Sequence, residues 1–193
     1  MPRSAAAAVL ALTLALALSA CVDAEEGPSL PTETSAPPTP TGTSAPTSTP
    51  TPGAEPLDVT CDELVDRDAA YAFDPNYALL DSWDPPAGSP AAEAVAGGGV
   101  ACQLVRESGG GTIDLSVARL SEEEIVAKKN DAFASSQMVP TYGEEAYFEV
   151  EGGVGTAIVF EGPYWLVISS AAFAEPGEPT EIIDAALAAL PAA

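Results

Sequence analysis

Alternating apolar and polar residues predict strands in the second half of the chain. Over residues 112–119, apolar side chains at every second position alternate with Asp114 and Ser116, which is the period of a strand with one buried face. The other predicted strands cover residues 100–107, 146–151, 154–160 and 164–170, with glycine-rich turns after several of them. The last two strands are apolar on both faces, so we expect them at the centre of a sheet.

The strand at residues 146–151 carries the clearest assignment of sides. Ala146, Phe148 and Val150 alternate with Tyr147 and two glutamates, Glu149 and Glu151. This period is typical of a strand, and it places Glu149 and Glu151 on its polar side.

A first helix is predicted over residues 60–73. Thr60 is a candidate N-cap, and Glu63 can reach back to complete a capping box. The helix should end near residue 73, because Asp74 precedes Pro75 and a residue before proline is pushed out of the α region.

Two further helices are predicted from caps and apolar stripes. Ser121 and Glu124 form a second capping box, and Glu124 and Lys128 can pair one helical turn apart. A last helix is predicted over residues 179–190, with Thr180 as a candidate cap. Its core stripe consists of Ile182, Ile183, Ala186, Leu187 and Leu190.

The order of these elements indicates the fold class. Residues 77–99, rich in proline and glycine, are predicted to be mostly loop with one short turn at residues 91–96. The order is therefore α-β-β-α-β-β-β-α. This order predicts an α+β domain in which helices cover a largely antiparallel, five-stranded sheet.

The N-terminus has the features of an export signal. Arg3 precedes an uncharged run over residues 5–18, which is too short to span the roughly 30 Å hydrocarbon core of a membrane but suits a signal peptide over residues 1–20. The run ends in Leu18-Ser19-Ala20-Cys21, which resembles the lipobox of bacterial lipoproteins. The alternative is an ordinary secretory signal cut nearby, for example after Ala24.

The lipobox resemblance implies a membrane anchor. In that family the cysteine, here Cys21, receives a diacylglycerol and the chain is cut just before it. The resemblance implies that palmitate is among the acyl chains attached to Cys21. Two acyl chains are enough to hold a protein stably on a membrane. The resemblance therefore implies that the mature chain is attached to the cell membrane on its extracytoplasmic face.

A stalk is predicted over residues 21–56, ahead of a single globular domain at residues 57–193. From Gly27 to Pro56, 21 of 30 residues are Pro, Ser or Thr, and the stretch has no aromatic residue, Lys or Arg. Such a composition buries too little apolar surface to fold, so we expect a disordered spacer through a cell wall. It also suits O-glycosylation, although a passive linker without sugar fits equally.

The cysteine count favours one disulfide. Cys21, Cys61 and Cys102 are the three cysteines of the chain, and lipidation of Cys21 leaves an even pair. In an oxidising compartment we expect Cys61 and Cys102 to be bonded. The domain is similar to small secreted domains of unknown function in lipoproteins of high-GC Gram-positive bacteria, through this pair and the order of its elements.

The charge of the chain excludes several classes of partner. It has 29 acidic residues, 6 basic residues and no histidine, a net charge of −23. Nucleic-acid binding depends on Lys and Arg at phosphates, so it is excluded, and a basic patch for anionic lipid is lacking. Any attachment to a membrane must come from the lipid on Cys21.

The candidate chemistry is sparse. Without histidine there is no Ser-His-Asp or Cys-His machinery, and no residue emerges as a catalytic, cofactor-binding or metal-binding candidate. Calcium needs converging oxygen ligands, and Asp58, Asp62, Asp66 and Asp68 crowd one short stretch. The pattern favours a solvated acidic surface over such a site.

An acid-only hydrolase needs just two carboxyls, but the acids that can be placed fall on solvent sides. These acids are Asp114, Glu149, Glu151 and Glu122–Glu124. Each is expected to be ionised and hydrated.

The aromatic residues offer one further hint. Tyr164 and Trp165 are neighbours in a strand and point to opposite faces, so one of them can form an exposed patch with Tyr142 and Trp83. Core packing is the favoured alternative. The leading hypothesis is a non-catalytic domain that binds or senses an unknown extracellular ligand or envelope protein. The alternatives are a carboxylate-dependent hydrolase acting on wall or exogenous polymer, and a passive structural envelope protein.

Overall fold

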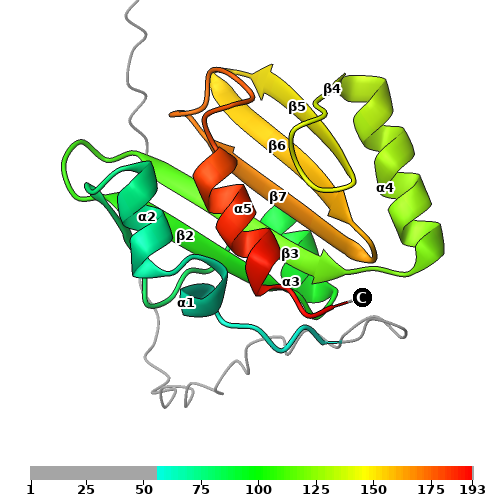
Figure 1. Cartoon of the computed structure of the whole chain (residues 1–193), viewed down its shortest axis with the longest axis horizontal. Helices are drawn as coiled ribbons and strands as arrows, with labels where there is room; N and C mark the ends of the chain where they lie inside the picture. Colours follow the sequence, from blue (N-terminus) through cyan, green and yellow to red (C-terminus); the bar gives the residue numbers. More distant parts are fainter. Residues whose placement is uncertain (1–55, 193) are drawn as a thin grey trace, which may run out of the picture. The chain divides into compact units, whose positions relative to one another are not determined.

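An antiparallel sheet of seven strands, in the order β1-β2-β3-β7-β6-β5-β4, organises the protein (Figure 1). The computed structural model describes residues 56–192, so the predicted leader, Cys21 and the stalk up to residue 55 lie outside the described residues. The elements are α1 (Cys61–Leu64), α2 (Arg67–Phe73), β1 (Tyr77–Leu79), α3 (Pro90–Ala96), β2 (Val100–Arg106), β3 (Thr112–Arg119), α4 (Glu122–Ser135), β4 (Gln137–Met138), β5 (Glu145–Glu151), β6 (Val154–Glu161), β7 (Tyr164–Ser170) and α5 (Thr180–Ala189). The predicted α+β class is confirmed.

The prediction of five strands is wrong, because two short edge strands complete the sheet. β1 lies in the segment predicted to be loop, and β4 follows α4 directly. Strands of three and two residues are too short to show an alternating pattern, so only their pairing with β2 and β5 reveals them. The five longer strands are those predicted, and β7 lies at the centre between β3 and β6.

The predicted first helix is broken into α1 and α2. Val65 leaves the helical conformation and is buried, and Asp66 then caps α2 by accepting the Ala69 N–H at 2.7 Å. The predicted end of the helix is correct, since Asp74 is extended (φ −161°, ψ 118°) before Pro75. A second departure is α3, a helix with Ser89 as its cap where only a turn was expected.

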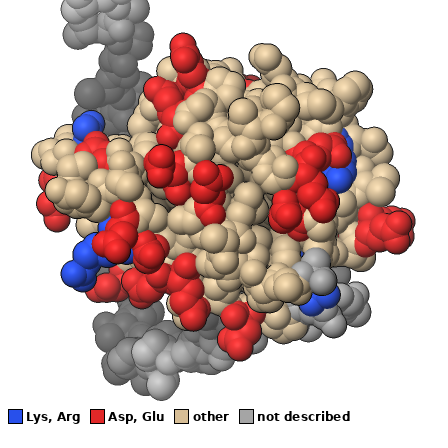
Figure 2. Space-filling model, in the orientation of Figure 1, with Lys and Arg blue, Asp and Glu red and all other residues tan. Residues whose placement is uncertain are grey.

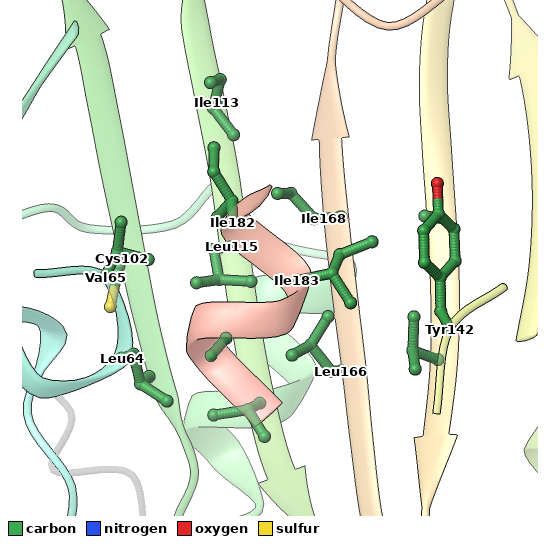
Figure 3. Close-up of a cluster of buried hydrophobic side chains, with 14 of the residues drawn as sticks. Leu64, Val65, Cys102, Ile113, Leu115, Tyr142, Leu166, Ile168, Ile182 and Ile183 are labelled. Atoms are coloured by element: carbon green, nitrogen blue, oxygen red, sulfur yellow. The ribbon is translucent and has the colours of Figure 1, made fainter. Parts of the chain in front are cut away.

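The sheet has two covered faces, which we call the first and the second face. The first face carries Leu104, Leu115 and Leu166 and packs under α1, α2 and α5. Figure 3 shows Ile182 and Ile183 of α5 pointing toward the strand residues of this core. The disulfide between Cys61 and Cys102, predicted from the sequence, joins α1 to β2 with 5.6 Å between their Cα atoms.

The second face is smaller and packs under α3 and α4. Its buried residues are Ala94, Ala118, Ile125, Ala132, Tyr147, Phe160, Trp165 and Val167. The predicted alternation of β5 is present, but both of its faces are partly covered: Tyr147 is only 2% exposed, beneath α4, whereas Val150 is 52% exposed. Val150 lines a hollow of about 400 Å³ beside β4, together with Phe148 and Pro176.

Helix lengths bear on the question of membrane spans. Within residues 56–192, no helix combines the length and the apolar character needed to cross a bilayer.

Candidate binding site

The predicted aromatic patch is absent, because its members are packed inside the described domain. Tyr142, Tyr164 and Trp165 are all buried, and Trp83 is half-buried. Tyr142 and Tyr164 belong to the core of the first face, and Trp165 to that of the second. Core packing, the favoured alternative, is correct for these three residues.

The four crowded aspartates do not form a metal site. Asp58, Asp62, Asp66 and Asp68 are exposed, and Asp66 already accepts a hydrogen bond as a helix cap. Within the described range, no group of three or more His, Cys, Asp or Glu residues is arranged to hold a metal ion.

The acids predicted to face solvent fall into two groups. Glu151 and Glu122–Glu124 are exposed, as expected. Asp114 and Glu149 are half-buried on the second face, where Asp114 accepts the Gln103 Nε2–H at 2.8 Å and Glu149 accepts the Ser136 hydroxyl at 3.0 Å. They are thus hydrogen-bonded within the protein and are less interchangeable than predicted.

Hydrogen bonds shift the pKa of four carboxyls downward. The Thr60 N–H lowers the pKa of Glu63, and the Asn76 N–H lowers that of Asp74. The Ser121 hydroxyl lowers the pKa of Glu124, and the Tyr147 hydroxyl lowers that of Glu145. These groups are held as anions, whereas a carboxyl that acts as a general acid at neutral pH needs a raised pKa.

A hollow of about 420 Å³ lies at the corner where α1, α2 and the outer edge of β1 meet. We call it the corner hollow. It is lined by Asp62, Val65, Asp66, Arg67, Ala70, Tyr71, Pro75, Tyr77, Ala78, Leu79 and Asp81.

The lining of the corner hollow divides into an apolar floor and a polar rim. Val65 and Ala70 are buried and form the floor with Leu79. The rim carries the carboxylates Asp62, Asp66 and Asp81, one guanidinium and the Tyr71 ring, which is 68% exposed. Concave sites with an apolar base and a few polar groups at the mouth are typical of ligand binding.

The backbone of β1 also faces the corner hollow. The Leu80 N–H donates to the Gln103 carbonyl at 2.9 Å, and the Glu107 N–H donates to the Asn76 carbonyl at 2.8 Å. In an antiparallel ladder this spacing makes Ala78 the hydrogen-bonded partner of Val105, so the peptide groups of Tyr77 and Leu79 point away from β2. The N–H and C=O of Leu79 are therefore available to a strand outside β1.

A second hollow, of about 540 Å³, lies on the other side of α2 and shares Pro75 and Tyr77 with the first. There the Arg106 Nη2 lies 3.1 Å from the Asp74 Oδ2, and the guanidinium carbon is 5.7 Å from the Tyr77 ring centroid. Because the charge of Arg106 is already paired, these contacts act mainly to hold Tyr77, and with it β1, in place.

The electrostatic surface around both hollows is acidic. Figure 2 shows Asp and Glu side chains gathered over the region of α1, α2 and α5, with few Lys or Arg among them. Sequence reasoning noted the aspartates of residues 58–68 but missed Tyr71 and Asp81. No pattern of residues connects these two positions, which meet only because β1 runs beside α2.

The chain matches no known protein family, no curated protein and no solved structure. Its function is therefore inferred from the export features of the sequence and from the geometry of the corner hollow.

Proposed function

We propose that the protein is a surface-anchored lipoprotein whose domain at residues 57–193 is a non-catalytic binding module. The corner hollow and the outer edge of β1 are its binding site. One observation carries this proposal: a 420 Å³ hollow with an apolar floor lies at the same corner as a strand edge whose Leu79 N–H and C=O point away from β2.

The anchor is supported by the Leu18–Cys21 lipobox and the apolar run before it. Cys21→Ala should release the protein from the membrane and abolish labelling by a fatty-acid analogue. Val22→Ala, just beyond the predicted cut, is the matched control and should keep the label. Equal labelling of Cys21→Ala and wild type would place the anchor elsewhere.

The binding site is testable with two equally exposed aromatic positions. Tyr71 at the corner hollow is 68% exposed, and Phe133 on α4 is 69% exposed. A photo-reactive phenylalanine analogue placed at residue 71 in cells should cross-link a partner that the same analogue at residue 133 does not. Identical cross-linked species from both positions would contradict the assignment of this corner.

A further inference from the structure

We infer that the corner hollow receives a lysine or arginine side chain from an extended polypeptide that adds as a strand beside β1. This inference rests on the proposed function and names the chemistry of the partner. It depends on the shape of the hollow, on its charges and on the free edge of β1.

The hollow suits a long cationic side chain. Lysine and arginine lay their methylene stems along apolar surface while the charged end reaches polar groups. Here the stem would lie over Val65, Ala70 and Leu79, and the charge would reach the carboxylates of Asp62 and Asp81 at the rim. The exposed Tyr71 ring adds an aromatic face, toward which cations are attracted.

The edge of β1 suits an extended backbone. The Leu79 N–H and C=O point outward, so a neighbouring strand can exchange hydrogen bonds with them. Tyr77 and Leu79 direct their side chains to the first face, and successive residues of an added strand alternate in the same way. Every second side chain of that strand would therefore point to the side on which α2 and the corner hollow lie.

The partner is a different polypeptide rather than another part of this chain. Residues 22–66 contain no Lys or Arg, so the chain's own N-terminal segment cannot supply the cation. Of the basic residues in the described domain, Arg67 lines the hollow itself, and the rest already have partners. Those are Arg106, Arg119, Lys128 and Lys129.

The other edge of the sheet is a poorer candidate. β4 has only two residues, and the hollow beside it offers Phe148, Val150 and Pro176 with a single carboxylate, Glu149. That carboxylate already accepts a hydrogen bond from Ser136. The β1 edge, with three carboxylates at its hollow, therefore complements a basic strand better than the β4 edge does.

The test is binding of a fluorescent hexapeptide of alternating valine and lysine to the purified full chain. A peptide with glutamate in place of lysine should not bind. Asp62→Asn combined with Asp81→Asn should weaken binding of the lysine peptide by about tenfold or more, which corresponds to about 1.4 kcal/mol. Glu122→Gln combined with Glu123→Gln on α4 is the matched control, with the same change in net charge, and should weaken it less than about twofold.

A second arm tests the strand geometry without altering the protein. The lysine peptide N-methylated at alternate residues keeps its charge but loses donors for pairing, and it should bind about tenfold more weakly. Amide NMR signals of Tyr71 and Leu79 should shift with the unmodified peptide.

The inference is overturned if the two charge-neutralising double variants weaken binding equally, or if N-methylation has no effect. It is likewise overturned if lysine amide alone competes as well as the peptide. In each case, cross-linking at residue 71 but not at residue 133 would leave the proposed function standing. Loss of that selective cross-linking would contradict the proposed function itself.

Discussion

The two faces of the sheet are closed by different physical means. On the first face, α5 buries Ile182, Ile183 and Ala186 against aliphatic strand residues, and a disulfide ties α1 to β2. On the second face, the helices contribute mainly alanines and one buried isoleucine, Ile125. The same sheet therefore has a larger, mostly aliphatic core on one side and a thinner cover on the other.

Lysine side chains complete the cover of the second face. The Lys128 Nζ lies 4.3 Å from the centroid of the Trp165 ring and 2.7 Å from the Glu93 Oε2, which connects α4 to α3. The Lys129 Nζ lies 5.5 Å from the centroid of the Phe160 ring and 3.0 Å from the Glu145 Oε2. The first face is thus held by a large buried core and a covalent link, whereas the cover of the second face adds charged side chains to a smaller core, and their contribution should respond to salt and pH.

The largest expected effect tests the covalent part of the first face. Replacing Cys61 and Cys102 together by serine should lower the free energy of unfolding by about 4 kcal/mol, since their separation of 41 residues sets the loop-closure entropy. Urea unfolding measures this change. Intact-mass analysis after alkylation should show no free thiol at either position in the exported wild type. Two free thiols at these positions would show that no disulfide stabilises the first face.

The second prediction compares one isoleucine from each face. Ile183→Ala should lower the free energy of unfolding by about 2–5 kcal/mol, because Ile183 is fully buried and its removal leaves a cavity. Ile125→Ala, beneath the thinner cover of α4, should fall at or below the lower end of that range. Urea unfolding of both variants measures these losses. Equal losses would contradict the prediction that the first face contributes more through burial than the second.

The third prediction concerns the charge that covers Trp165. Lys128→Met keeps a long apolar side chain but removes the ammonium, and it should lower the free energy of unfolding by about 1 kcal/mol. Arg67→Met, on the other face, is the matched control and should change it by less than about 0.5 kcal/mol. In 1 M salt, the difference in free energy of unfolding between Lys128→Met and wild type should become smaller. An unchanged difference would indicate that Lys128 stabilises the fold through packing and not through its charge.

The fourth prediction is a pH dependence that arises from one hydrogen-bonded pair on the second face, Tyr147 and Glu145. The Tyr147 hydroxyl donates to the Glu145 Oε1 at 2.6 Å, which lowers the pKa of Glu145 and raises the pKa of Tyr147 to about 12. The lowered carboxyl pKa contributes stability that is present above the unfolded value of about 4.3 and is lost as the pH falls. The raised tyrosine pKa contributes stability that is present below about pH 10 and is lost as the pH rises toward 12.

Tyr147→Phe makes this dependence measurable. The free energy of unfolding of wild type should exceed that of the variant by about 1 kcal/mol between roughly pH 5 and pH 10. The difference should become smaller below and above that pH range. Thermal unfolding across that range is the measurement. A difference that is constant with pH would show that the hydroxyl acts only through packing.

The smallest expected effect probes a polar group within the core of the first face. The Tyr142 hydroxyl is buried without a hydrogen-bond partner among the described residues, and burial raises its pKa. Tyr142→Phe removes the unsatisfied group, so the free energy of unfolding should stay within about 0.5 kcal/mol or rise. A loss above about 1 kcal/mol in urea unfolding would show that the hydroxyl is bonded in solution.

Local patterns were sufficient for much of the fold. Three strands of the sheet interior were predicted from residues 112–119, 154–160 and 164–170. The first alternates because one of its faces is buried, and the other two are apolar runs because both of their faces are buried. The Ser121–Glu124 capping box was recognisable for the same reason, since all of its groups lie within four residues. The disulfide followed from cysteine count and compartment.

Sequence reasoning was less successful where a residue's surroundings come from distant segments. Lys128 was expected to pair with Glu124 one turn away, and its charge does help to lower the pKa of that carboxyl. Its ammonium also donates a hydrogen bond to Glu93, 35 positions distant, and lies over the Trp165 ring, and neither contact could be predicted from the local pattern. The alternation of residues 146–151 could not show that Tyr147 is buried and Val150 exposed, because the burial of Tyr147 depends on α4, which packs over it from another segment of the chain.

Residues close in the chain and composition were enough to predict the order of the main strands, the Ser121 cap and the even pair of cysteines. The predicted Thr180 cap is wrong: Thr180 is the first residue of α5, after Pro179, and its hydroxyl donates to the Gly177 carbonyl. The edge strands β1 and β4, the break at Val65 and the corner hollow, by contrast, became visible only in the folded chain. The physical reason is that a strand edge and a hollow are defined by backbone pairing and side-chain packing between segments far apart. Asp62, Tyr71 and Asp81 acquire a common environment only when the chain closes those contacts.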